Sequence, residues 1–74
     1  MNAPDRIVDA RGMLCPWPVL RLARAARELG GPGSVRILAD DPVAPGEIEQ
    51  LCREHGWSFS SDASDPEAFT IMVG

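Results

Sequence analysis

The sequence has no lysine, a single histidine and only two cysteines. All seven basic residues are arginine, so a lysine Schiff base and a lysine nucleophile are excluded. General acid–base chemistry is limited to His55 and the carboxylates. Because two cysteines and one histidine at wide spacing do not form a zinc site, we expect no metal.

Long apolar runs and an export signal are also missing. The apolar runs extend over a few residues, far short of the roughly 20 that a membrane-spanning helix needs. The first five residues have neither the basic nor the apolar region of a signal peptide. We therefore expect a cytoplasmic protein without a membrane span, in which both cysteines stay reduced.

The chain is short and acidic. With 74 residues, folding buries only about 60% of the surface that the unfolded chain exposes, which leaves room for one small domain. We expect residues 1–5 to form a flexible N-terminus and residues 6–74 to form the domain. Eleven acidic side chains against seven basic ones give a net charge of -4, which argues against direct nucleic-acid binding.

Apolar periodicity predicts four strands and two helices in the order βαβαββ. Helical spacing marks the helices, whereas the last two segments alternate apolar and polar residues as half-buried strands do. The expected strands are 6–10, 34–39, 57–61 and 68–73, and the expected helices are 16–29 and 45–55. The apolar face of the first helix is predicted to consist of Val19, Leu22, Ala26 and Leu29.

This order predicts an α/β protein with one sheet. Two consecutive βα units favour a right-handed crossover with the first two strands parallel, and the polar turn at 62–67 favours a hairpin for the last two. At this size, both helices are expected on one face of the sheet. The loops after the first two strands then open at the same edge, which makes Cys15 a neighbour of Asp40 and Asp41 in space.

Cys15 lies at the expected start of the first helix, beside Pro16 and Pro18. Backbone N–H groups and the positive end of the helix dipole favour a thiolate there, and the thiolate is the nucleophilic form. The two prolines stiffen the first turn and remove two N–H donors. Since cysteine is a poor helix-capping residue, a purely structural role explains its presence badly, and we favour a reactive thiol.

The motif Cys-Pro-x-Pro, preceded by Asp-x-x-Gly-x-x, resembles the signature of the TusA/SirA family of small sulfur carrier proteins. The resemblance extends over nearly the whole chain. The matching positions are Asp9, Gly12, Cys15, Pro16 and Pro18, followed by Val19–Leu20, Ala39–Pro42, Cys52 and Gly56. The resemblance implies a two-layer α/β sandwich with a four-stranded mixed sheet, in agreement with the element order.

The same resemblance implies that Cys15 accepts sulfur as a persulfide and relays it to a cysteine of a partner protein. The donors are then cysteine desulfurases or rhodanese-type proteins, and the outlets include tRNA thiolation, molybdenum cofactor assembly and sulfur oxidation. No cofactor is implied besides the covalent persulfide. Because a sulfur relay needs an exposed nucleophilic sulfur and a docking surface, we expect a carrier rather than a stand-alone turnover enzyme.

Two features of the first helix are candidates for docking. Arg21, Arg24 and Arg27 recur at every third position, either as a solvated helix flank or as a docking surface for an acidic partner. Trp17, next to the cysteine motif, is expected to be exposed and to anchor an interface.

Asp40 and Asp41 are expected to shape the turn after the second strand and to start the second helix. Because nearby carboxylates disfavour a thiolate, they oppose the effect of the helix start on Cys15. Two other roles stay open for them: limiting stray reactivity of the thiol, or contacting an arginine of a partner.

Cys52 and His55 are expected to be structural. Cys52 lies on the apolar face of the second helix with Ile48 and Leu51, which predicts a buried thiol. His55 is expected on the same apolar side near the helix C-terminus, where an imidazolium suits the helix dipole.

Two other functions remain open from the sequence. One is a redox-sensing or regulatory adaptor, in which Cys15 senses oxidation or packs at an interface. The other is a small thiol oxidoreductase that cycles a disulfide between Cys15 and Cys52, which requires their Cα atoms to lie within about 7 Å. The predicted burial of Cys52 in mid-helix argues against the oxidoreductase.

Overall fold

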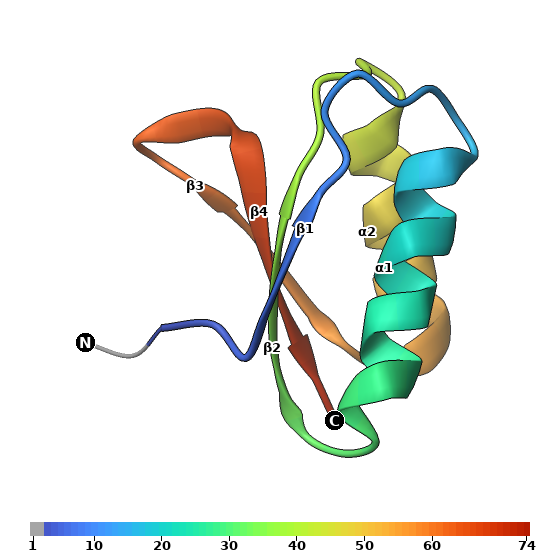
Figure 1. The fold of residues 1–74 in the computed structure, drawn as a ribbon, viewed down its shortest axis with the longest axis vertical. Coiled ribbons are helices and arrows are strands. Elements are labelled where there is room, and N and C mark those ends of the chain that lie inside the picture. Colours follow the sequence, from blue (N-terminus) through green and yellow to red (C-terminus); the bar gives the residue numbers. More distant parts are fainter. Residues whose placement is uncertain (1–2) are drawn as a thin grey trace.

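The computed structural model describes residues 3–74 and has the predicted order of elements (Figure 1). The strands are β1 (Arg6–Asp9), β2 (Gly33–Leu38), β3 (Ser58–Asp62) and β4 (Asp65–Val73). The helices are α1 (Trp17–Leu29) and α2 (Ala44–His55). The order βαβαββ is therefore confirmed.

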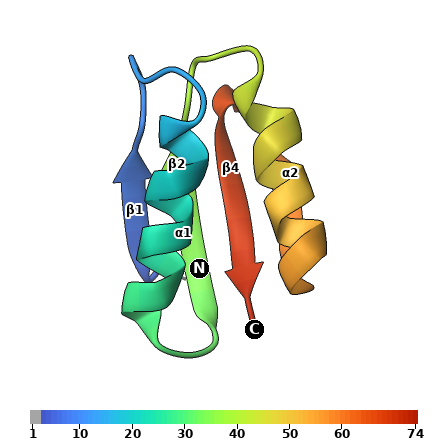
Figure 2. The same cartoon turned by 90° about the vertical axis from the view of Figure 1, so that its right-hand side faces the viewer.

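The four strands form one mixed sheet in the order β1-β2-β4-β3. β1 pairs with β2 in parallel, and β4 pairs antiparallel with both β2 and β3. Figures 1 and 2 show both helices against the same face of the sheet. The predicted two-layer α/β sandwich with a four-stranded mixed sheet is therefore confirmed.

The hairpin between β3 and β4 is tighter than predicted. The sequence predicts a polar turn over 62–67, but β4 already begins at Asp65. The Asp62 carboxylate accepts hydrogen bonds from the N–H and the hydroxyl of Ser64, at 2.9 and 2.7 Å, so the chain reverses within two residues. These bonds, together with an ion pair to Arg36 at 2.9 Å, lower the pKa of Asp62 to about 2.

The buried face of α1 is rotated from the predicted one. Leu22 and Ala26 are buried as predicted, but Pro18 and Ala25 are buried with them, whereas Val19 is only half-buried. Positions 18, 22 and 25 follow i, i+4, i+7 spacing and therefore share one side of the helix. The helix ends at Leu29 and is capped by Gly30, whose φ of 70° is the left-handed value that glycine adopts without a steric penalty.

The core lies between the helices and the two central strands. The helix-facing side chains of β2 and β4 and the buried side chains of both helices fill it. The largest fully buried members are Leu22, Ile37, Ile48, Ile71, Val35, Pro18 and Cys52.

The N-terminal segment is tied to the sheet at Asp5. Its N–H donates to the Ser34 carbonyl oxygen at 3.0 Å, and the Ser34 N–H donates to its carboxylate at 2.8 Å. Of the segment 1–5 expected to be flexible, residues 1 and 2 lie outside the described residues. No helix within residues 3–74 is long and apolar enough to cross a membrane.

We expect Leu22→Ala to lower the free energy of unfolding by about 2–5 kcal/mol, because a fully buried leucine is removed from a close-packed core. Leu20→Ala is the matched control, since that side chain is exposed on the same helix and its loss should cost less than about 1 kcal/mol. Urea unfolding followed by circular dichroism measures both. Equal effects of the two substitutions would contradict the described packing of α1.

Candidate functional site

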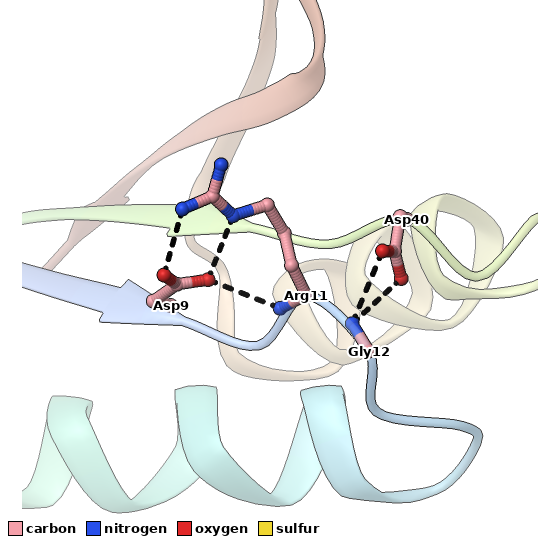
Figure 3. Close-up of polar contacts among 4 residues, drawn as sticks. All are labelled: Asp9, Arg11, Gly12 and Asp40. Carbon is pink, nitrogen blue, oxygen red and sulfur yellow. Dashed lines mark hydrogen bonds and ion pairs between the residues drawn. The ribbon is translucent and has the colours of Figure 1, made fainter.

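The loops that follow β1 and β2 meet at one edge of the sheet (Figures 1 and 2). The Gly12 N–H donates to both carboxylate oxygens of Asp40, at 2.9 and 3.1 Å (Figure 3). The Cys15 N–H donates to Asp41 Oδ2 at 2.8 Å. The predicted proximity of Cys15 to Asp40 and Asp41 is therefore confirmed.

The first part of the cysteine loop is shaped by Asp9, Arg11 and Gly12. Arg11 forms a two-pronged ion pair with Asp9, with N–O distances of 2.9 and 2.8 Å, and its N–H donates to the same carboxylate (Figure 3). These contacts lower the pKa of Asp9 to about 2. Gly12 has a φ of 82°, a left-handed value that favours glycine, so the chain can turn towards Asp40. The role of Arg11 is not among those predicted from the sequence.

Asp41 holds the cysteine loop against the start of α2. One carboxylate oxygen accepts the Cys15 N–H, and the other accepts the Val43 N–H at 3.1 Å. Its carbonyl oxygen accepts the Ala44 N–H at 3.0 Å, which closes the turn into α2. Asp41 is only 9% exposed, so these hydrogen bonds satisfy a charge that is largely withdrawn from water. The predicted turn and helix-start role of Asp41 is confirmed, and a direct link to Cys15 is added.

The Cys15 thiol is exposed and donates a hydrogen bond to a carboxylate of α2. The distance from Cys15 Sγ to Glu47 Oε2 is 2.8 Å. Glu47 lies in the first turn of α2, 32 positions from the cysteine. The sequence pattern alone does not predict this contact. The available signal was an acidic residue in the first turn of the helix that directly follows Asp41.

The pKa of the Cys15 thiol is raised above its ordinary value. The main cause is the hydrogen bond to Glu47, followed by partial removal from water and the negative charges of Glu47 and Asp41. The expectation that the helix start favours a thiolate is therefore wrong for the free protein.

The physical reason lies in the N–H groups that follow Cys15. Helix α1 begins only at Trp17, and neither Pro16 nor Pro18 carries an N–H. The Trp17 N–H donates to the Leu14 carbonyl oxygen at 2.9 Å and is thus engaged in a turn. Because its first backbone N–H donors are missing or engaged, the helix start does not offset the effect of the neighbouring carboxylates on the pKa of the Cys15 thiol.

Exposed apolar side chains flank the thiol. They are Leu14, Trp17 and Val43, which are 70, 59 and 55% exposed, and we refer to them as the apolar rim. Leu14 and Trp17 lie in the cysteine loop and the first turn of α1, and Val43 shares the Asp41 carboxylate with Cys15. The predicted exposure of Trp17 is confirmed. Its role as an interface anchor remains a prediction.

The three arginines of α1 are exposed. Arg24 pairs with Glu28 on the same helix at 3.2 Å, and Glu28 also pairs with Arg6 of β1 at 3.4 Å. Arg21 and Arg24 line a surface hollow between α1 and β1. Exposure agrees both with a solvated helix flank and with a docking surface for an acidic partner. The docking role of Arg21, Arg24 and Arg27 therefore remains a prediction.

Cys52 is buried as predicted, with 1% of its surface exposed, and burial raises the pKa of its thiol. Both cysteines are free. His55 lies in the last turn of α2 as predicted, but it is exposed rather than buried with the apolar side of the helix, and it stacks on Trp57 with ring centroids 4.4 Å apart. Within residues 3–74, no group of three His, Cys, Asp or Glu side chains could hold a metal ion.

These observations define a class of small two-layer α/β proteins that present one cysteine from the loop before the first helix. The family model described as "Sulfurtransferase TusA" matches residues 6–74 of the chain. The chain therefore belongs to the TusA family, as the cysteine motif predicts.

Individual relatives agree with this assignment. The chain is 39% identical over 70 residues to the sulfur carrier protein TusA of Pseudomonas putida strain W619, which covers 95% of this chain and 88% of that protein. It is 32% identical over 66 residues to a putative sulfur carrier protein of Neisseria meningitidis serogroup B, which covers 89% of each. The crystal structure of a SirA-like protein from Desulfitobacterium hafniense superposes with a TM-score of 0.81 at 29% identity, covering 93% of this chain and 97% of that one.

We expect Asp41→Ala to lower the free energy of unfolding by about 1–3 kcal/mol, because two backbone N–H groups lose their acceptor. Asp41→Asn keeps one acceptor oxygen and should cost less. Amide hydrogen exchange at Cys15 and Val43 should accelerate in Asp41→Ala beyond the change seen in the rest of the sheet. Unchanged exchange at both amides would show that Asp41 does not hold the loop.

Proposed function

We propose that this protein is a sulfur carrier that binds sulfane sulfur as a persulfide on Cys15 and relays it to a cysteine of a partner protein. The observation that carries the proposal is the exposed Cys15 thiol, presented from a loop that Asp40 and Asp41 fix at the edge of the sheet. Relatives named as sulfur carrier proteins support it. The proposed place of action is the cytoplasm, and the proposed donor is a cysteine desulfurase or a rhodanese-type protein.

The relay consists of two sulfur transfers. In the first, Cys15 attacks the outer sulfur of a donor persulfide, a new S–S bond forms on Cys15, and the donor cysteine leaves as a thiolate. In the second, an acceptor thiolate attacks the outer sulfur on Cys15, and Cys15 leaves as a thiolate that is then protonated. Both steps are exchanges at sulfur, so neither needs an added oxidant or reductant.

The surroundings of Cys15 suit relay better than turnover of a small substrate. The thiol is exposed, and it lines neither the surface hollow on the sheet near Arg36 and Thr70 nor the one between α1 and β1. A partner's active-site cysteine can therefore reach it directly. The apolar rim offers the partner a surface whose burial stabilises a complex.

The buried position of Cys52 supports a carrier over a thiol oxidoreductase. An internal disulfide would require a core side chain of α2 to move to the surface, since Cys52 is 1% exposed and Cys15 is exposed. The alternative function, a redox-sensing adaptor, needs only Cys15. The experiment below distinguishes it from a sulfur carrier.

Incubation with a cysteine desulfurase and L-cysteine should add one or more sulfur atoms to the protein, measured by intact-protein mass spectrometry. We expect the adduct to disappear in Cys15→Ser and to persist in Cys52→Ala, which serves as the matched control. Sulfur on Cys52, or oxidation of Cys15 without any sulfur adduct from this donor or from polysulfide, would overturn the proposal. The latter result would favour the redox-sensing adaptor.

A further inference from the structure

The carboxylate of Glu47 differs from the other two acidic groups beside the cysteine loop. Asp40 and Asp41 accept backbone N–H groups, of Gly12 in one case and of Cys15 and Val43 in the other. The side chain of Glu47 instead accepts the thiol of Cys15. Its charge therefore acts on the reactive sulfur, whereas the charges of Asp40 and Asp41 chiefly hold the loop.

Glu47 also has no cationic partner among the ion pairs of residues 3–74. The arginine of α2, Arg53, pairs with Glu49 instead, at 3.5 Å. The remaining pairs join Arg6 and Arg24 to Glu28, Arg11 to Asp9, and Arg36 to Asp62. The negative charge next to the thiol is thus left for water or for a bound partner to compensate.

In the free protein this arrangement favours the protonated thiol over the thiolate. Only the thiolate attacks a persulfide or an electrophile at a useful rate, and two carboxylates, those of Glu47 and Asp41, oppose its formation. The exposed cysteine is therefore accessible and yet weakly nucleophilic. Small sulfur donors in solution should load it slowly.

Docking of a partner changes the balance between the thiol and the thiolate of Cys15. A protein that covers the apolar rim removes water from Glu47 at the same time, because Val43 and Glu47 lie one turn apart at the start of α2. A carboxylate that loses water without a counter-charge opposes binding. A cationic side chain opposite Glu47 removes this penalty, and the same positive charge favours the thiolate of Cys15.

We propose that Glu47 holds the thiol proton of Cys15 in the free protein and releases it in complexes whose partner places a cationic side chain against the Glu47 carboxylate. This inference rests on the proposed sulfur relay. In such a complex the proton passes from Cys15 Sγ to water, the thiolate attacks the outer sulfur of the donor persulfide, a new S–S bond forms on Cys15, and the donor S–S bond breaks. The departing donor thiolate takes up a proton from water, so protons and electrons balance. Glu47 thereby restricts sulfur loading to matching protein donors.

The first arm of the test measures how the ionisation of the Cys15 thiol depends on pH. Glu47→Gln removes the charge, and Glu54→Gln makes the same charge change at an exposed position of the same helix. The rate of Cys15 alkylation by iodoacetamide is followed against pH, with the label located by mass spectrometry. We expect Glu47→Gln to move the midpoint of the alkylation rate against pH to lower pH, and to speed alkylation at pH 7 several-fold. The reason is that each unit by which the pKa of Cys15 falls raises the thiolate fraction about tenfold. Glu54→Gln should match the wild type.

The second arm compares two sulfur donors: sodium tetrasulfide, and a cysteine desulfurase with L-cysteine. We expect Glu47→Gln to load faster than the wild type from tetrasulfide but slower from the desulfurase, because the partner's cation loses its carboxylate. An unchanged alkylation midpoint overturns the claim that Glu47 holds the proton. An equal change with both donors overturns the dependence on a protein partner.

The two proposals fail separately. If the wild type takes up no sulfur from either donor, the proposed relay is wrong, while the alkylation profile still decides whether Glu47 controls the thiol. Circular dichroism of each variant shows that the fold is retained, which keeps a loss of structure from being mistaken for an effect on Cys15.

Discussion

The functional edge of this protein depends on the capture of one loop by carboxylates from another. Two loops that are far apart in the sequence meet because β1 and β2 are parallel neighbours, so the chain leaves both at the same edge. Asp40 and Asp41 then accept N–H groups from Gly12 and Cys15. Without these hydrogen bonds the segment that carries the cysteine would be held to the rest of the fold mainly by the packing of Met13 against the core and by the Ala10 N–H bond to Leu38. With them, an exposed thiol has a defined position.

This anchoring has an electrostatic consequence. Asp41, which fixes the loop, and Glu47 place negative charge beside the thiol and favour its protonated form. A free carrier with a strongly nucleophilic cysteine would react with oxidants and electrophiles before reaching its partner. A carrier whose thiol stays protonated until a partner supplies positive charge avoids this loss. In the proposed relay, small size suits the task, because it lets the edge of the sheet that carries Cys15 approach the active site of a larger partner.

Much of the architecture follows from the sequence, since apolar periodicity and the handedness of βα units act over short stretches of chain. The same rules place Cys15 beside Asp41 and bury Cys52. They do not identify the hydrogen bond between Cys15 and Glu47, which lie 32 positions apart in the sequence. This contact depends on how α2 is rotated about its axis and on the rotamer of the Glu47 side chain. They also predict the wrong effect of the helix start on the Cys15 thiol, because the N–H groups that the prolines lack affect its pKa more than the dipole of α1 does.

The most direct test of the central claim is the ionisation of Cys15 in the native free protein, followed by NMR through the Cβ chemical shift of that residue as the pH is raised. The same titration of the urea-unfolded chain provides the reference. The native midpoint should lie above the unfolded one, because the neighbouring carboxylates favour the thiol. A native midpoint below the unfolded one would mean that the thiolate is already favoured without a partner, and would contradict the claim that Glu47 keeps Cys15 protonated.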